Sequence, residues 1–389
     1  MGHPHSHAHG LGHDHVHHAE QVVLDGPAVP LHLVGRLVET GEPVEFWVAD
    51  GRLHTEPVAD AQTVCSDGWI MPGLVDAHCH IGLDAHGEVD RDTTERQALD
   101  ERDAGVLLVR DAGSPADTGW IDDRDDLPRV IRAGRHIARP RRYIRNYAAE
   151  VEPDDLVAEV ERQVARGDGW VKLVGDWIDR DLGDLAPLWE PEVARAAISR
   201  AHELGAKVTA HCFGEESVAQ LVEAGIDGIE HGTGMDESVI DLMVANQVAL
   251  VPTMVNLENF PGIADSAQDK FPRYAAHMRD LHQRRLQTLR LAREAGVAIF
   301  AGTDAGGVLP HGLVGQEVER LGTIGDADFA LGAASWRARA WLGRPGLEPG
   351  APADLVVLDE DPRANLAVLR HPRLVVLRGR VVRAATVSS

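Results

Sequence analysis

The sequence is poor in cysteine and lacks any long apolar run. Its three cysteines, Cys65, Cys79 and Cys212, are irregularly spaced, and such a sparse, odd number favours reduced thiols over a disulfide framework. No run reaches the roughly 18 apolar residues that a membrane-spanning helix needs, so we expect no such helix. The polar, histidine-rich N-terminus also differs from a secretory signal peptide. These absences together predict a cytoplasmic protein.

Basic residues are scarce relative to acidic ones. The chain has 38 lysines and arginines against 62 aspartates and glutamates, which gives a formal net charge of −24. Such an acidic surface disfavours nucleic acid and anionic membranes as partners. We therefore expect a small-molecule substrate, and a homo-oligomer stays open. The 44% hydrophobic content supports a real core, and 389 residues suit a large barrel with a small accessory domain.

Histidine, in contrast, is concentrated in residues 1–20. This segment can be interpreted as a flexible metal-collecting tail, or as an expression tag or natural disordered leader, and we favour the second interpretation. It is therefore left out of the fold prediction. Its histidines are His3, His5, His7, His9, His13, His15, His17 and His18.

Short β-type segments occur near both ends of the chain. Residues 31–48 hold two apolar runs around a Gly-Glu-Pro turn, and residues 354–382 show the same pattern. Short apolar runs bounded by turn residues are typical of strands. We predict one small β-sandwich domain built from both ends, with residues 21–70 as its first half and residues 347–389 as its second.

The middle of the chain alternates between strand-like and helix-like segments. Alternation of this kind predicts parallel strands with right-handed crossovers, and eight repeats over residues 71–346 fit a (β/α)8 barrel of about 250 residues or more. The predicted strands are residues 70–75, 105–111, 129–131, 170–174, 206–210, 225–229, 248–252 and 297–301. The predicted helices include residues 154–166, 191–204, 217–224 and 275–295.

Two histidines follow the first predicted strand. Successive side chains on a strand point to opposite faces, so His78 and His80 share one face and can reach the same point. Such a pair alone is more often hydrogen-bonded and inert than metal-binding. In a barrel, however, the C-terminal strand ends meet at one mouth, and other ligand-type residues occur there. These are Lys172 within the fourth strand, His211 after the fifth, His231 after the sixth and Asp304 after the eighth.

This set has the composition of a metal centre. Four neutral imidazoles could hold two divalent ions, and Asp304 adds an anionic ligand. A lysine ammonium beside two metal ions would be repelled in a low-dielectric pocket, whereas a carbamate formed from Lys172 and carbon dioxide is an anion that could bridge both. An ion-paired lysine is the alternative, but the position of Lys172 within this set favours the carbamate.

Several motifs carry a resemblance to a known family. They are Pro72-Gly73-Leu74-Val75-Asp76-Ala77-His78-Cys79-His80, Val171-Lys172-Leu173, His211, Glu230-His231-Gly232-Thr233 and Gly302-Thr303-Asp304-Ala305-Gly306. Together with the C-terminal segment 349–357, they resemble the amidohydrolase superfamily of metal-dependent hydrolases over about residues 31–385. The chain is most similar to the imidazolonepropionase-like and Xaa-Pro or Xaa-Arg dipeptidase branch.

The resemblance implies a role for every ligand-type residue. A binuclear zinc centre is implied, with the more buried metal held by His78, His80 and Asp304, the second by His211 and His231, and both bridged by the carbamate of Lys172. A water shared by two cations has its pKa lowered toward neutrality. Asp304 would take its proton as a general base and later pass that proton to the leaving nitrogen as a general acid.

The loop after the third predicted strand is rich in arginine. Arg142, Tyr143 and Arg145 lie in this loop, which should form one wall of the mouth. A guanidinium clamp for a substrate carboxylate is one interpretation, and ion pairing with the acidic stretch 122–126 is the other; the two stay balanced for Arg142 and Arg145. His277 is a further candidate for substrate binding, although its predicted helix favours a surface position.

The favoured function is hydrolysis of an amide bond in a carboxylate-bearing small molecule, such as an N-acyl amino acid or a dipeptide. Two alternatives stay open. One is a mononuclear opener of cyclic amides or a deaminase, similar to imidazolonepropionase, which would bind one metal ion instead of two. The other is a non-enzymatic metal-binding protein that uses its histidine-rich tail; deletion of residues 1–20 would then remove all tightly bound metal.

Overall fold

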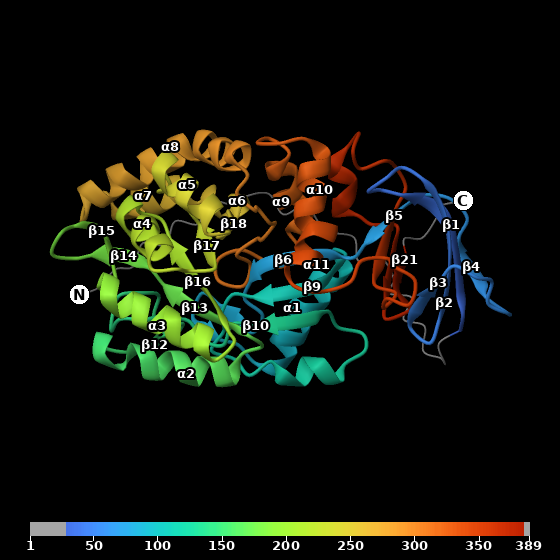
Figure 1. The fold of residues 1–389 in the computed structure, drawn as a ribbon, viewed down its shortest axis with the longest axis horizontal. Coiled ribbons are helices and arrows are strands. Elements are labelled where there is room, and N and C mark those ends of the chain that lie inside the picture. The colour runs from blue at the N-terminus through green and yellow to red at the C-terminus, as the bar shows by residue number, and fades with distance from the viewer. Residues whose placement is uncertain (1–28, 385–389) are drawn as a thin grey trace, which may run out of the picture.

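The computed structural model describes residues 29–384 and shows a mixed α/β fold (Figure 1). A sheet made from both chain ends lies at one end of the molecule, and the helices and parallel strands form the larger remainder. The histidine-rich segment 1–20 lies outside the described residues. Within the described residues, no helix is both long and apolar enough to cross a membrane.

The sheet of the chain ends contains eight strands in the order β21-β20-β19-β5-β1-β2-β3, with β4 also paired to β1. The N-terminal and C-terminal halves meet where Met71 pairs with Val356 in antiparallel register. A cluster of buried apolar side chains, which includes Leu33 and Leu355, stabilises the sheet. The strands are β1 (Leu31–Leu37), β2 (Pro43–Ala49), β3 (Arg52–His54), β4 (Gln62–Cys65), β5 (Trp69–Pro72), β19 (Leu355–Leu358), β20 (Leu374–Leu377) and β21 (Arg380–Ala384).

Two further sheets are parallel throughout, with the orders β10-β9-β6 and β12-β11-β13-β16-β17-β18. Strands β6, β9 and β13 are buried at every residue, as expected of parallel strands covered on both faces. The strands are β6 (Leu74–Cys79), β9 (Val106–Asp111), β10 (Arg129–Arg132), β11 (Ile137–Ala138), β12 (Ala149–Glu150), β13 (Trp170–Val174), β16 (Lys207–Cys212), β17 (Gly228–His231) and β18 (Ala249–Val251).

Backbone hydrogen bonds connect these two parallel sheets. Leu250 of β18 donates to Ala298, and Ala77 of β6 donates to Ala301, so residues 298–301 lie between β18 and β6. The same two sheets are also consecutive along the chain, because β11 of the second sheet follows β10 of the first after a short turn. Because the pairings are parallel, the carboxyl ends of β6, β16 and β17 lie along one edge.

Helices cover the parallel strands (Figure 1). The four helices that were predicted with bounds are present as α2, α3, α4 and α8, with end points shifted by a few residues; the other helices were expected from the alternation without bounds. Helix α5 begins where the Asp236 side chain accepts a hydrogen bond from the Val239 N–H, a typical N-cap. The helices are α1 (Arg91–Asp103), α2 (Leu156–Arg166), α3 (Pro191–Glu203), α4 (Glu215–Glu223), α5 (Glu237–Ala245), α6 (Met254–Leu257), α7 (Phe260–Ala267), α8 (Pro272–Ala295), α9 (Val314–Leu321), α10 (Ala327–Ala334) and α11 (Trp336–Trp341).

Two short antiparallel hairpins interrupt the alternation of strands and helices. The first pairs β7 (Leu83–Asp84) with β8 (Gly87–Glu88), and the second pairs β14 (Asp176–Asp179) with β15 (Asp184–Pro187). The second hairpin follows β13 and was not predicted, because its polar residues resemble those of a loop. Short 3-10 helices complete the fold at Gly119–Asp123, Pro153–Asp155 and Leu366–Arg370.

Candidate metal centre

Three ligand-type side chains converge beyond the carboxyl end of β6. The Nε2 atoms of His78 and His80 lie 3.2 Å apart. The Oδ1 atom of Asp304 lies 3.1 Å from His78 Nε2 and 2.9 Å from His80 Nε2. Both histidines are buried, and Asp304 is only partly exposed. The structure thus brings together three residues that are far apart in the sequence.

Hydrogen bonds fix which nitrogen of each imidazole carries the proton. His80 Nδ1 lies 2.7 Å from the carbonyl oxygen of Gly113, which can only accept, so this nitrogen donates. His78 Nδ1 likewise donates to the Glu230 carboxylate at 2.8 Å. A protonated His80 ring would donate from Nε2 to Asp304 Oδ1 at 2.9 Å. With both rings neutral, the two Nε2 lone pairs and Asp304 Oδ1 form a donor set that fits a divalent metal ion.

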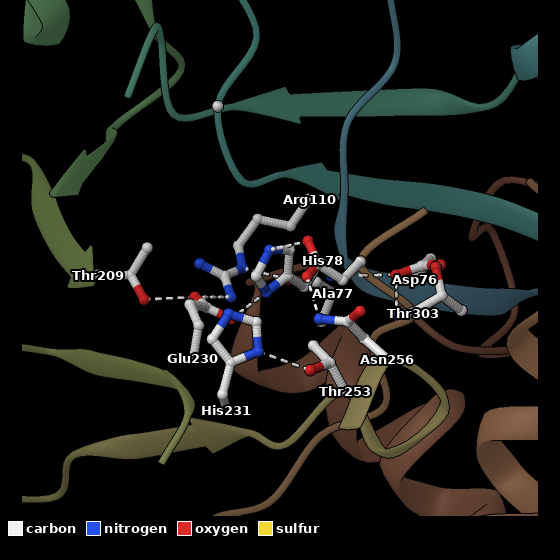
Figure 2. Close-up of polar contacts among 12 residues, drawn as sticks. Asp76, Ala77, His78, Arg110, Thr209, Glu230, His231, Thr253, Asn256 and Thr303 are labelled. Atoms are coloured by element: carbon white, nitrogen blue, oxygen red, sulfur yellow. Dashed lines mark hydrogen bonds and ion pairs between the residues drawn. The ribbon is translucent and has the colours of Figure 1, made fainter. Parts of the chain in front are cut away.

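Backbone contacts hold Asp304 against β6. Asp76 accepts hydrogen bonds from the hydroxyl group of Thr303 at 2.5 Å and from its N–H at 3.1 Å, and Figure 2 shows this pair beside His78. The N–H of Asp304 donates to the His78 carbonyl at 2.7 Å. Asp304 has a φ of 60°, a left-handed conformation that is unusual for a residue with a Cβ atom. This strained backbone therefore requires the surrounding contacts.

His211 and His231 lie beside this group at the ends of β16 and β17. The ring centroid of His231 lies 5.3 Å from that of His78 and 4.8 Å from that of His211. His231 Nδ1 is 2.7 Å from the hydroxyl oxygen of Thr253 (Figure 2). His78, His231 and Asp304 form a set of ligand atoms that could hold one ion.

Buried polar atoms without partners occur next to His211. In the part of the chain that the structure describes, His211 Nε2 and Asp176 Oδ1 have no hydrogen-bond partner, and they lie 3.7 Å apart. That distance exceeds a hydrogen bond. Burial lowers the pKa of His211 well below its ordinary value and that of His231 to about 3. Both imidazoles are therefore neutral at physiological pH, as a metal ligand must be.

Lys172 of β13 is almost fully buried, with 1% of its surface exposed. No other residue among 29–384 makes a hydrogen bond or ion pair with its side chain. Burial lowers the pKa of Lys172, although the charges of Glu230 and Asp304 act in the opposite direction. The predicted alternative of an ion-paired lysine therefore has no partner in the described residues.

A buried ion pair that the sequence analysis missed supports His78 from behind. Arg110 donates to Glu230 at 2.6 Å and to the carbonyl of Ala77 at 2.8 Å (Figure 2). The hydroxyl group of Thr209 also donates to Glu230. Burial alone would raise the pKa of Glu230, but Arg110 and His78 hold it well below its ordinary value. Glu230 is thus an anion that orients the His78 ring.

A second group of residues that the sequence analysis did not identify supports Asp304. The amide of Asn256 donates to Asp304 Oδ2 at 2.7 Å. Asn256 lies in α6, whose first N–H groups, from Met254 and Val255, donate to the buried carboxylate of Glu317. Burial raises the pKa of Glu317 to about 8. This carboxyl group therefore links α9 to the helix that carries Asn256.

Aromatic rings surround His211. The ring centroids of Tyr143 and Trp177 both lie 5.6 Å from His211, and that of Phe213 lies 4.3 Å away. His136 lies between Tyr143 and His80, with ring centroid distances of 5.4 and 4.9 Å. Of the predicted substrate-binding residues, Tyr143 is therefore the one that contacts the centre.

The two predicted arginines of this loop differ in their surroundings. Arg142 forms an ion pair with Asp179 of the hairpin at 2.8 Å, and it also donates to the carbonyl of Trp177 at 3.3 Å. Arg145 is exposed, and no ion pair engages it within residues 29–384. The acid that pairs with Arg142 therefore comes from the unpredicted hairpin and not from the stretch 122–126.

His277 lies in α8, as predicted, and is paired with two carboxylates. Its ring bridges two carboxylates, with Nδ1 at 2.9 Å from Asp184 and Nε2 at 2.9 Å from Glu215. These hydrogen bonds raise the pKa of His277 to about 9. The structure thus shows His277 as a cation that links α8 to β15 and α4.

Some of the missed residues had a signal in the sequence. Glu230 directly precedes His231 and is an acid in the fully buried strand β17, which is an unusual place for a carboxylate. Asn256 lies between the predicted strand 248–252 and the predicted helix 275–295, in a segment for which no element was predicted. His136 had no distinguishing pattern among the neighbouring arginines.

Comparisons with known proteins agree with this geometry. A model of the amidohydrolase family matches residues 69–382. An uncharacterised protein of Mycobacterium tuberculosis is 57% identical over 355 residues, which cover 91% of this chain and 96% of that protein. The ochratoxinase of Aspergillus niger is 24% identical over 404 residues, which cover 91% of this chain and 83% of the relative.

Solved structures show the same similarity of fold. A Xaa-Pro dipeptidase with methionine bound in its active site gives a TM-score of 0.74 at 24% identity, covering 91% of this chain and 99% of the other. The crystal structure of A. niger ochratoxinase gives a TM-score of 0.75 at 20% identity, covering 92% and 96%. The similarity therefore extends over nearly the whole described chain.

Proposed function

Because this chain belongs to the amidohydrolase family and is a hydrolase of carbon–nitrogen bonds, we propose that it cleaves an amide in a small, carboxylate-bearing molecule. An N-acyl amino acid or a dipeptide has the required chemistry. The similarity to a Xaa-Pro dipeptidase supports a peptide-like substrate. We propose that its partner is this small molecule and neither nucleic acid nor a membrane, and that the protein is cytoplasmic. A homo-oligomer is also compatible with the sequence.

The observation that carries this proposal is the convergence of the Nε2 atoms of His78 and His80 on Asp304 Oδ1. We propose two divalent ions, with zinc as the metal. The first would be held by His78, His80 and Asp304, and the second by His211 and His231. When bound, such ions lower the pKa of a water and stabilise negative charge on a substrate oxygen.

Lys172 is proposed to carry a carbamate that bridges the two ions. In this reaction the lysine nitrogen bonds to the carbon of carbon dioxide and releases one proton, so a neutral amine becomes an anion with two ligand oxygens. The lowered pKa of the buried amine supports its neutral form. An anion at this position would also offset the repulsion between two cations.

Asp304 is proposed to move the proton. Its carboxylate would accept a proton from the attacking water and pass it to the leaving nitrogen, so that the same group acts first as base and then as acid. Asn256 holds one oxygen of Asp304 at 2.7 Å and would keep the carboxylate in one orientation during both transfers. Tyr143, Arg142 and Arg145 are proposed to contact the substrate, whereas His277 now fits a structural role better.

The fold proposal that accompanies this function is a (β/α)8 barrel over residues 71–346. The hydrogen bonds of residues 298–301 to both β18 and β6 support closure of the strand series. Residues 21–70 and 347–389 are proposed as the two halves of a small β-sandwich. In such a barrel the strand ends that carry the candidate ligands form the mouth.

A second candidate is a mononuclear enzyme that opens a cyclic amide or removes an amine. It is favoured by the set His78, His231 and Asp304, whose ligand atoms lie close enough to share one ion. Membership of the family argues against the third alternative, a non-enzymatic metal-binding protein. The number of bound ions separates the first two candidates.

The test combines metal analysis with a substrate screen. The zinc-loaded protein, with and without residues 1–20, is analysed for metal and assayed with N-acyl amino acids, dipeptides and lactams. We expect two ions per chain without the tail and cleavage of an open-chain amide. One ion per chain with turnover of lactams only would favour the second candidate, and no ion without the tail would contradict both.

A further inference from the structure

An arginine-lined cavity of about 170 Å³ lies among β9, β10, α11 and the segment that precedes β19. Arg129 begins β10, Arg339 lies in α11, Arg344 follows that helix and Asp354 directly precedes β19. The cavity is therefore at the amino end of a parallel strand, whereas the candidate metal ligands lie at the carboxyl ends. It is a separate site from the metal centre.

Arg339 is the buried member of this group, with 4% of its surface exposed. Its Nε donates to the carbonyl of Gly73 at 2.7 Å, and Nη1 donates to that of Pro345 at 3.4 Å. Its Nη2 is buried and has no hydrogen-bond partner in the described part of the chain. A buried cationic donor without a partner is costly, so a group that accepts from Nη2 would stabilise the protein.

The charges around the cavity do not balance. Asp354 is its one carboxylate; it lies 3.5 Å from Arg129 Nε and also accepts from the N–H of Arg378 at 2.8 Å. Arg344 is exposed, and neither it nor Arg339 forms an ion pair within residues 29–384. Burial lowers the pKa of Arg339 to about 10, which still leaves it charged at neutral pH. Three guanidinium groups and one carboxylate thus line the cavity, and the charge of Glu348 also acts on Arg339.

A second cavity of about 320 Å³ adjoins the first and shares Arg129 and Pro352 with it. Three further arginines line this second cavity, namely Arg52, Arg378 and Arg380, together with Asp50 and Asp125. The positive region therefore extends beyond the space that one small ion would fill. A phosphate group in the first cavity could carry an organic part that reaches the second.

We propose that the first cavity is a binding site for a phosphate dianion, either free or as the monoester of a small molecule. Guanidinium groups donate paired hydrogen bonds to tetrahedral oxyanions, and a dianion complements the excess of positive charge among the lining residues. The bound group would contact Arg129, Arg339 and Arg344, which all line the cavity. It would thereby connect β10, α11 and the segment that enters β19.

The test measures binding of inorganic phosphate and, in parallel, glycerol phosphate to the metal-loaded enzyme by isothermal titration calorimetry. Arg344→Gln is the main variant, because an exposed side chain without an ion pair can be changed without harm to folding. Arg129→Gln is the second variant. Arg195→Gln is the matched control, since Arg195 is exposed on α3 and lines neither cavity.

We expect the wild type and the Arg195 variant to bind phosphate equally, and both cavity variants to bind it about tenfold or more weakly. Tighter binding of glycerol phosphate would identify a monoester as the ligand, and equal or weaker binding would identify the free ion. Absence of phosphate binding in the wild type would overturn the proposal, because the cavity would then hold water alone. Affinity that is unchanged in both cavity variants would also overturn it, because the phosphate would then be bound elsewhere, for example at the metal centre.

Discussion

Replacing Glu230 by glutamine tests how His78 is held. Glu230 is fully buried and accepts from three donors, namely Arg110, His78 and Thr209. Glutamine keeps the shape of the side chain but has one acceptor oxygen and one NH2 group, so at least one donor must face another donor. The substitution also leaves Arg110 as an unpaired charge beside the rings of Trp170 and Trp341, whose centroids lie 4.7 and 5.1 Å from the guanidinium carbon.

The expected losses of folding stability and of metal affinity are large for a change of one atom. Removing one partner of a buried ion pair destabilises a protein by about 3–5 kcal/mol. Losing the carboxylate behind a ligating histidine lowers metal affinity about 10- to 100-fold. Both effects should occur together in Glu230→Gln, because the same carboxylate pairs with Arg110 and orients His78.

Chemical denaturation and metal titration measure the two losses separately. Glu216→Gln is the control, because Glu216 is exposed on α4 and should change neither quantity. In the double variant Arg110→Met/Glu230→Gln no unpaired charge remains, so its stability loss should be smaller than the sum of the two single losses. Wild-type stability and metal affinity in Glu230→Gln, or strictly additive losses in the double variant, would refute this reasoning.

Four further predictions concern the sites already described. Lys172→Ala should lose at least one metal ion per chain by elemental analysis, with partial rescue of content and rate by short carboxylic acids; unchanged content and rate would exclude the carbamate. Asp304→Asn should lower turnover by at least about 10²–10⁴-fold while metal largely stays bound, and near-full turnover would mean that another group moves the proton. Arg145→Met should lower kcat/KM for acidic amides about 10- to 100-fold without affecting kcat/KM for neutral analogues, and an equal loss on acidic and neutral substrates would exclude a carboxylate clamp. Arg142→Met should lower kcat/KM for both kinds of substrate, because it also releases the hairpin. The pKa of His277 is raised from 6.5 to about 9 on folding, so its ion pairs stabilise the protein fully below about pH 6.5 and are lost as the pH rises through 9. Chemical denaturation should therefore show His277→Gln to be less stable than wild type near pH 6 but similar to it above about pH 10. A stability deficit that grows with pH would contradict this.

Sequence patterns predicted those parts of the site that are locally encoded. His78 and His80 share a face because of the two-residue period of a strand, and that period needs no knowledge of the rest of the fold. His211 and His231 were found because each follows an apolar strand in a regular alternation. The structure places these four residues together, as the alternation predicts, although their role as ligands stays a prediction.

The supporting contacts could not be predicted in the same way. Glu230 contacts Arg110 across 120 residues and His78 across 152 residues, and no local period relates such positions. The hairpin that provides Asp179 was hidden because its strands are short and polar. The partner of Arg142 is therefore Asp179 and not an acid of the stretch 122–126, which was the example given for the ion-pair alternative.

The shared sheet of the two chain ends affects synthesis of the protein. Strand β5 pairs with β1 on one edge and with β19 on the other, and Leu355 leaves the ribosome some 280 residues after Pro72. At roughly 5–20 residues per second, the open edge of β5 waits about 14–56 s for its partner. An unpaired edge is a template for other chains, so the nascent protein is exposed to aggregation until nearly all of it has been translated. Chaperone occupancy during translation should therefore persist until β19 emerges.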